Sequence, residues 1–126
     1  MQDGKYVILC IDDDPDILSF LEIVLEAEGY VYAGAASAEE GLKVFKVVDP
    51  DLIIVDLMME EVDAGTGFAR ELKILQNRAP IFMLSSVGDN LNMTTDYTSL
   101  GLAGVFQKPL SKETLLAVLR AKLPES

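Results

Sequence analysis

Five short apolar runs are spaced along the chain, each bounded by polar or turn-forming residues. They cover residues 6–11, 30–33, 52–55, 80–84 and 104–107. Runs of this length that are rich in Val, Ile and aromatic residues predict β-strands, and unbroken apolar runs predict strands buried on both faces.

Helical patterns separate these strands. Apolar residues recur on one face of the first helix, at Ile17, Leu18, Leu21, Val24 and Leu25. Asp14 suits the N-cap of this helix, Pro15 its first turn and Gly29 its C-terminal end. Ser37 and Glu40 form a capping box that opens a second helix, with Leu42 and Phe45 facing inward.

Three more helices are expected in the second half of the chain. Residues 68–76 predict a helix with Phe68, Leu72 and Leu75 on its inner face, and residues 89–97 predict a weak, exposed one. Ser111 caps a last helix that stops before Pro124. Alternation of strands and helices predicts a parallel sheet with right-handed crossovers, and a single doubly wound α/β domain over residues 1–126 (repeat from about 5 to 123).

Composition narrows the class of protein. The 126 residues contain one cysteine, Cys10, inside an apolar run, which excludes a disulfide framework and favours a reducing compartment. No apolar stretch approaches the ~20 residues that cross a bilayer, and the N-terminus does not resemble a signal peptide. We therefore expect a cytoplasmic protein without a membrane segment.

The net charge of −11 argues against direct binding of nucleic acid, which needs clustered basic residues. The chain has no histidine. Ser-His-Asp and Cys-His catalysis and the usual zinc sites are thereby excluded. A phosphohistidine in this protein's chemistry would have to belong to another molecule.

Polar residues stand where four of the predicted strands end. Asp12 and Asp13 follow the first strand, Asp56 the third, Ser85 the fourth and Lys108 the fifth. Because the carboxyl ends of parallel strands meet at one edge, these residues should share a cleft. Three carboxylates there would repel one another, and a divalent cation, best Mg²⁺, would relieve this.

The same residues suit phosphoryl chemistry. Lys108 and the Ser85 hydroxyl would face the anionic oxygens of a phosphoryl group, and Asp56 would be the nucleophile that forms an aspartyl phosphate. Asp14 and Asp16 are interpreted as first-turn acids that the helix dipole favours.

At these stretches the sequence resembles a known family. ILCIDDDPDIL, DLIIVDLMM, IFMLSS and FQKP resemble the receiver domain of two-component response regulators, over essentially the whole chain. The resemblance implies a flavodoxin-like, five-stranded parallel sheet of order 2-1-3-4-5 with five helices.

The resemblance also implies roles for individual residues. Asp56 corresponds to the phosphoacceptor, Ser85 to the family's hydroxyl and Lys108 to its lysine. The implied metal ligands are Asp12, Asp13 (direct), Asp56 and the backbone carbonyl of Met58. The implied function is to take a phosphoryl group from a histidine kinase or phosphotransfer protein, or from a small phosphodonor. The signal would then pass to an output domain or target docking on the 89–123 face.

Three departures from the family pattern are visible. Val105 stands where an aromatic residue is usual, and strand alternation points Phe106 to the opposite face. Glu60 replaces a usual proline, and Ser85 replaces the commoner threonine. Because of Val105 and Phe106, the coupled movement of hydroxyl and aromatic side chain in the family is expected to be altered or absent.

Apolar Met58 and Val87 would flank the acceptor, so we expect slow self-dephosphorylation. We do not expect an enzyme that turns over external phosphate esters. Met58 also occupies the place of the second acid that a dehalogenase-type phosphatase needs. A flavin binder is disfavoured because residues 12–14 would repel its phosphate. The alternative left open is a receiver-fold interaction module that works without phosphorylation.

Overall fold

A computed structural model describes residues 3–56, 71–72, 74–75, 77–85 and 103–123. All five expected strands are found, with ends within two residues of those predicted. In chain order the elements are β1 (Val7–Ile11), α1 (Pro15–Ala27), β2 (Val31–Ala35), α2 (Ala38–Val48), β3 (Leu52–Asp56), β4 (Ile81–Ser85), β5 (Gly104–Gln107) and α5 (Lys112–Lys122).

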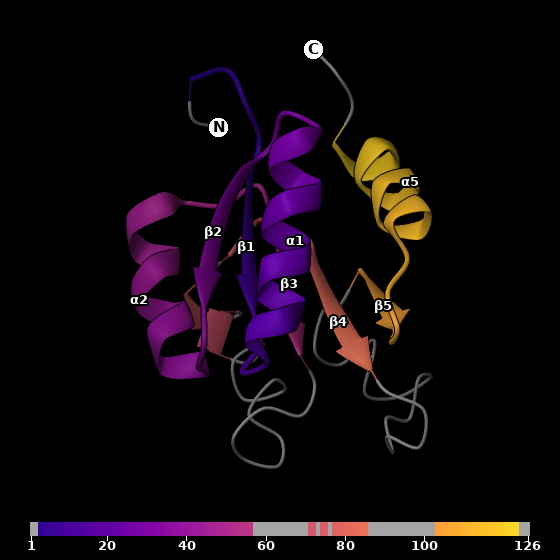
Figure 1. Ribbon diagram of the computed structural model, residues 1–126. Helices are drawn as coiled ribbons and strands as arrows, with labels where there is room; N and C mark the ends of the chain where they lie inside the picture. Colours follow the sequence, from indigo (N-terminus) through magenta and orange to yellow (C-terminus); the bar gives the residue numbers. More distant parts are fainter. Residues whose placement is uncertain (1–2, 57–70, 73, 76, 86–102, 124–126) are drawn as a thin grey trace.

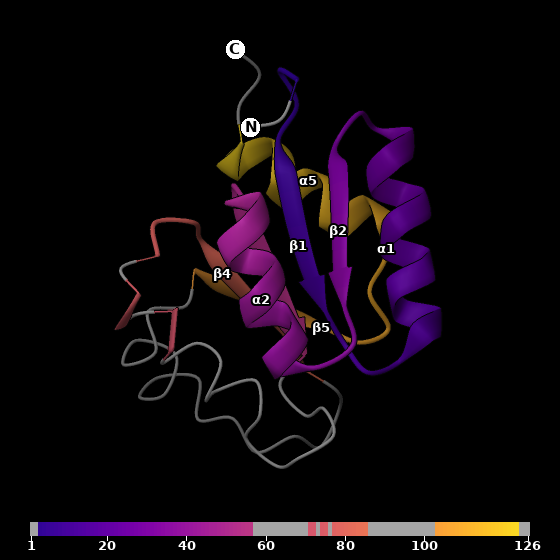
Figure 2. The same cartoon turned by 90° about the vertical axis from the view of Figure 1, so that its left-hand side faces the viewer.

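The strands form one parallel sheet in the order β2-β1-β3-β4-β5, which confirms the expected topology. The arrowheads of the strands point the same way in Figure 1, so their carboxyl ends lie along one edge. Helices α1 and α5 pack on one face of the sheet and α2 on the other (Figure 2). This arrangement leaves the carboxyl edge as the meeting place of residues that are distant in sequence.

The core consists of two layers, one on each face of the sheet, and alternate residues of the central strands belong to alternate layers. In β1, Ile8 and Cys10 belong to the cluster under α1 and α5, and Leu9 and Ile11 belong to the cluster under α2. Every residue of β1, β3 and β4 is buried. The unbroken apolar runs are thus explained by strands that alternate between two covered faces.

The helix starts follow from local hydrogen bonds. The side chain of Asp14 accepts from the N–H of Asp16 at 2.9 Å, and Ser37 Oγ accepts from Glu40 N–H at 3.1 Å. Ser111 Oγ likewise accepts from the N–H of Thr114 at 3.1 Å. The three predicted N-caps are therefore confirmed.

The third helix differs from its prediction at its end. Leu72 is fully buried as expected, but Leu75 is 43% exposed, so the inward orientation predicted for it was wrong. The reason is that the helix has already ended at Leu75: the N–H of Asn77 donates to the carbonyl of Leu72, and the chain turns toward β4. Phe68 and the predicted helix 89–97 lie outside the described residues. Among the helices that the structure describes, none is long and apolar enough to span a bilayer.

Candidate functional site

The sheet brings the predicted strand-end residues to its carboxyl edge. Asp56 and Ser85 are the last residues of β3 and β4, while Asp12 and Lys108 directly follow β1 and β5. The register places Asp56 beside Leu84, and Ser85 beside Gln107. Asp12, Asp56 and Ser85 are buried, although each carries a polar or charged side chain.

Asp12 is held by two neighbouring elements. Its N–H donates to the carbonyl of Ala35 at the end of β2 (3.1 Å), and its Oδ1 accepts from the N–H of Asp14 before α1 (2.9 Å). Its Oδ2 is buried and accepts no hydrogen bond, although Lys108 Nζ lies 3.3 Å away. An anionic oxygen left in this state is costly unless a cation compensates it.

Lys108 forms ion pairs with two of the carboxylates. Its Nζ lies 3.2 Å from Asp56 Oδ1 and 3.3 Å from Asp12 Oδ2, and only 19% of its side chain is exposed. Burial lowers the pKa of Lys108, but the negative charges of Asp12 and Asp56 together outweigh burial and raise the pKa above its ordinary value. The ammonium group therefore stays charged at neutral pH.

The backbone around Lys108 is also fixed. Its N–H donates to the carbonyl of Ser85 at 2.8 Å, and the Lys108–Pro109 peptide bond is cis. Ser85 itself is 4% exposed. The lysine and the serine are thereby tied together at the ends of adjacent strands.

Three carboxylates gather at this edge. One oxygen from each of Asp12, Asp13 and Asp56 lies within 4.8 Å of the others, and Asp13 is the exposed member. Within the described part of the chain, the Lys108 ammonium is the one cation paired with this group, which leaves it with a net charge of −2 (three carboxylates against one cation). An all-oxygen donor set with one side open to solvent suits a hard divalent cation, and the unsatisfied Asp12 Oδ2 fits such a ligand. The cluster could therefore hold a metal ion.

The two β5 residues singled out in the sequence face opposite sides, as predicted. Phe106 is buried under α1 and α5, where its ring stacks on Phe82 with 5.2 Å between centroids. Val105 packs against the other layer. An aromatic side chain thus lies on the far face of the sheet from position 105. Met58, Glu60 and Val87 lie outside the described residues.

The sequence matches the response regulator receiver domain family over residues 8–120. The chain belongs to this family. "Probable transcriptional regulator ycf27" from Cyanophora paradoxa is 36% identical over 98% of this chain and 50% of its own length. Transcriptional regulatory protein GlrR from Escherichia coli is 34% identical over 94% of the chain and 26% of its own length. The chain thus spans about half or less of the length of these curated relatives.

Solved structures give the same fold. A CheY-like receiver domain protein from Methanospirillum hungatei is 27% identical, with a TM-score of 0.86 over 96% of this chain and 95% of that chain. Chemotaxis protein CheY4 from Vibrio cholerae is 27% identical, with a TM-score of 0.85 over 94% and 99% of the two chains. The α/β architecture expected from the sequence is therefore that of a CheY-like receiver domain.

Proposed function

We propose that this chain accepts a phosphoryl group on Asp56 from a phosphohistidine of a partner protein, with Mg²⁺ as cofactor, and signals by a change of conformation. One observation carries the proposal. The buried Asp56 carboxylate lies 3.2 Å from Lys108 Nζ and shares a 4.8 Å cluster with Asp12 and Asp13. A nucleophile, a fixed cation and a cation-binding acidic pair are the parts that phosphoryl transfer requires.

Each residue has a separate part in the transfer. An oxygen of Asp56 attacks phosphorus, the P–N bond to the donor imidazole breaks, and the imidazole leaves and takes up a proton. Lys108 and the Ser85 hydroxyl meet the phosphoryl oxygens that carry the negative charge. Asp12, Asp13, Asp56 and the carbonyl of Met58 would hold Mg²⁺, which supplies positive charge beside those oxygens.

The partners follow from the same chemistry. This chain has no histidine, so the donor imidazole must come from a histidine kinase or a phosphotransfer protein. The curated relatives have names of transcriptional regulators and are longer than this chain. A linked output domain or a separate target, contacting the 89–123 face, is the proposed recipient of the signal.

The test is the intact mass of the protein after incubation with Mg²⁺ and acetyl phosphate. We expect one added phosphoryl group, lost in Asp56→Asn and in the presence of EDTA. Asp51→Asn is the matched control, because Asp51 is an acid at the opposite end of the same strand, and it should still be phosphorylated. Modification that persists in Asp56→Asn would place the acceptor elsewhere and contradict the proposal.

One observation favours a second function. Phe106 is fixed in the core by Phe82, and position 105 carries valine, so an aromatic side chain that reports phosphorylation is missing from that place. A receiver-fold interaction module that works without phosphorylation is consistent with this. Absence of any mass adduct, together with absence of Mg²⁺ binding in calorimetry, would support this alternative.

The lifetime of the phosphoryl group is a further expectation of the proposal. Apolar side chains at Met58 and Val87 would leave the attacking water without a polar partner, so self-dephosphorylation should be slow. We expect Met58→Asn to shorten the lifetime of the adduct, measured as its decay after removal of acetyl phosphate. An unchanged decay would refute this explanation without affecting the role of Asp56.

A further inference from the structure

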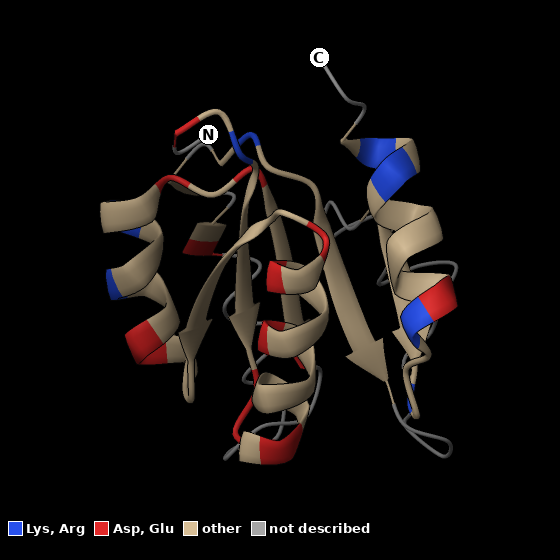
Figure 3. Cartoon of the chain, turned by 45° about the horizontal axis from the view of Figure 1, so that its top comes forward, with Lys and Arg blue, Asp and Glu red and all other residues tan. Residues whose placement is uncertain are grey.

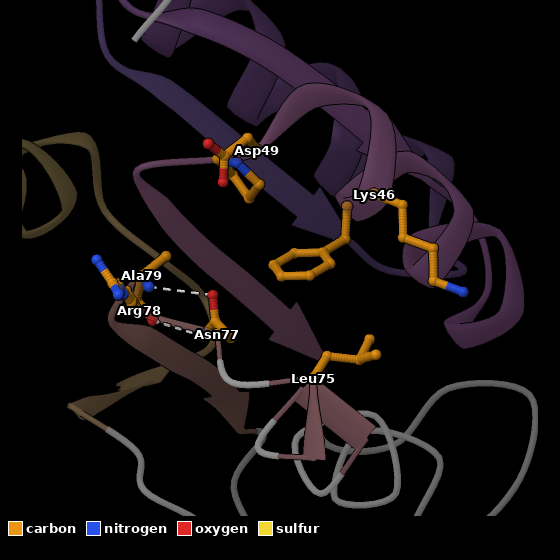
Figure 4. Close-up of a pocket in the computed structure, with 8 residues that line it drawn as sticks. Lys46, Asp49, Leu75, Asn77, Arg78 and Ala79 are labelled. Atoms are coloured by element: carbon orange, nitrogen blue, oxygen red, sulfur yellow. Dashed lines mark hydrogen bonds between the residues drawn. The ribbon is translucent and has the colours of Figure 1, made fainter.

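A pocket of about 450 Å³ opens at the other end of the sheet, away from the carboxylates. It lies between the C-terminal end of α2, the turn that follows, and residues 75–79 before β4 (Figure 4). Phe45, Pro50 and Leu75 supply its apolar lining, and Lys46 and Arg78 supply positive charge.

One wall of this pocket is held in place by its own hydrogen bonds. Asn77 Nδ2 donates to the carbonyl of Ala79 at 2.8 Å, and Asn77 Oδ1 accepts from the N–H of Ala79 at 3.0 Å (dashed lines in Figure 4). The amide of Asn77 is therefore engaged in shaping the loop. Recognition of a ligand is left to the apolar lining and to the charged side chains.

Exposed hydrophobic residues occur in the two chain segments that form the pocket. Among the described residues, the exposed large hydrophobic side chains are Ile23, Val47, Ile74 and Leu75. Leu75 lines the pocket, and Val47 and Ile74 directly follow or precede residues that line it. Leu75 is therefore an exposed apolar side chain that lies in the pocket itself, where a partner could cover it.

The charge of the pocket is opposite to that of the protein. Lys46 and Arg78 form no ion pair within the described part of the chain, and Figure 4 shows them on either side of the opening. Asp49 is the one acid among the lining residues. With a net charge of −11 for the whole chain, this is a local basic site on an acidic molecule. It suits an apolar side chain flanked by carboxylates.

Helix α1 carries such a group. Ile23 is 69% exposed, and Glu22 and Glu26 beside it are exposed as well. Residues three and four apart lie on the same side of a helix, so the isoleucine and Glu26 share one surface. The helix Pro15–Ala27 contains no Lys or Arg, and Figure 3 shows acidic positions along it, whereas α2 carries both acidic and basic ones, with Lys46 in its last turn.

We propose that α1 of one copy of this chain docks into the α2 pocket of a second copy, with Ile23 entering between Phe45 and Leu75. Glu22 and Glu26 then face Lys46 and Arg78. Helices α1 and α2 pack on opposite faces of the sheet, so a chain cannot make this contact with itself. Because the two surfaces lie on opposite faces of the sheet, one pair of chains cannot form both contacts at once, and the contact repeats head to tail rather than closing as a two-fold dimer.

The experiment is sedimentation equilibrium of the whole chain with EDTA, up to millimolar protein and at physiological ionic strength. The wild type should self-associate weakly, because the net charges repel. Glu26→Lys and Lys46→Glu should each weaken association about tenfold or more, because residues 26 and 46 that meet at the contact then carry charges of the same sign. An equimolar mixture of the two variants should recover wild-type association, because each helix again meets a pocket of opposite charge.

Matched controls separate this contact from a change in total charge. Glu113→Lys and Lys112→Glu make the same charge changes at exposed positions of α5 and should leave association unchanged. Ile23→Ser should abolish it. Phosphorylation of Asp56 by acetyl phosphate should persist in all variants and shows that they are folded. A wild type that stays monomeric, or a mixture no more associated than its separate variants, would overturn the proposal.

Discussion

The two ends of the parallel sheet use carboxylates in opposite ways. At the amino end, Asp51 Oδ2 accepts from the N–H of Val7 at 2.7 Å, and the N–H of Asp51 donates to the carbonyl of Val7 at 2.8 Å. The acid thus fastens the start of β3 to the start of β1. At the carboxyl end, Asp12 keeps one oxygen buried without a hydrogen bond beside two other carboxylates.

The difference shows which end of the sheet is stabilised by its carboxylate and which end keeps its carboxylates for chemistry. A carboxylate that accepts from a backbone N–H is a stabilising part of the sheet. Crowded carboxylates are costly in the free protein, where the Lys108 ammonium offsets only part of the charge of Asp12, Asp13 and Asp56, and a bound cation or ligand can compensate the rest. The same residue type therefore serves structure at one end and chemistry at the other.

The largest effect should come from removing the cation at the carboxyl end. Lys108→Met removes the positive partner that the described residues give Asp12 and Asp56, and we expect a loss of about 2–3 kcal/mol, less than for a fully buried pair because the side chain is partly exposed. The measurement is urea unfolding at neutral pH in EDTA. Lys112→Met, at an exposed position of α5, should change the free energy of unfolding little. Equal stability of the two variants would show that the carboxylates do not need the lysine.

The amino end should respond next. Asp51→Ala removes the charged acceptor of the Val7 N–H and should cost about 1.5–3 kcal/mol in the free energy of unfolding. Asp51→Asn, which retains an acceptor oxygen, should lose about half as much. Asp49→Asn is the control, because Asp49 is exposed and has a φ of 47°, a conformation that asparagine tolerates. If Asp51→Ala were as stable as this control, the two ends would not differ as described.

A smaller effect is expected near the start of the edge strand β2, at Tyr32. Burial, and then the charges of Cys10, Glu22 and Glu26, raise the pKa of Tyr32 to about 12 from the ordinary 10.0. The folded state therefore holds this proton more tightly than the unfolded state, and stability should fall as the pH rises from 10 toward 12. Tyr32→Phe should flatten that part of the stability profile. The pKa itself can be measured from the ring ¹³C shifts of Tyr32, and a value near 10 would contradict the prediction.

Much of this fold could be predicted from the sequence because its signals are local. The strands are unbroken apolar runs, and the N-caps Asp14 and Ser37 act within a few residues. The hydrogen bond of Asp51 could not be predicted in this way. Beside Pro50, Asp51 indicates only a turn, and its partner Val7 is 44 residues away in the sequence. Leu75 was predicted to face inward because its spacing continued the helix, but the helix ends there.

The site could be predicted in part for the same reason. Strand-end positions bring Asp12, Asp56 and Lys108 to one edge in any parallel sheet of this order. The pairing of Lys108 with both carboxylates could not be predicted, because it depends on the conformation that the long lysine side chain adopts at the carboxyl edge of the sheet. The unsatisfied oxygen of Asp12 is likewise a property of packing.

The most direct test of the contrast between the two ends is the free energy of unfolding of wild type and Asp12→Asn, each in EDTA and in saturating Mg²⁺. Wild type should gain about 1.4 kcal/mol for each tenfold rise in Mg²⁺ above the dissociation constant. Asp12→Asn should lose this gain, yet be as stable as wild type or about 1 kcal/mol more stable in EDTA, because the carboxylate repulsion is reduced. Asp51→Asn should respond to Mg²⁺ like wild type. A variant Asp12→Asn that is clearly less stable in EDTA, or that keeps the full response to Mg²⁺, would contradict the account.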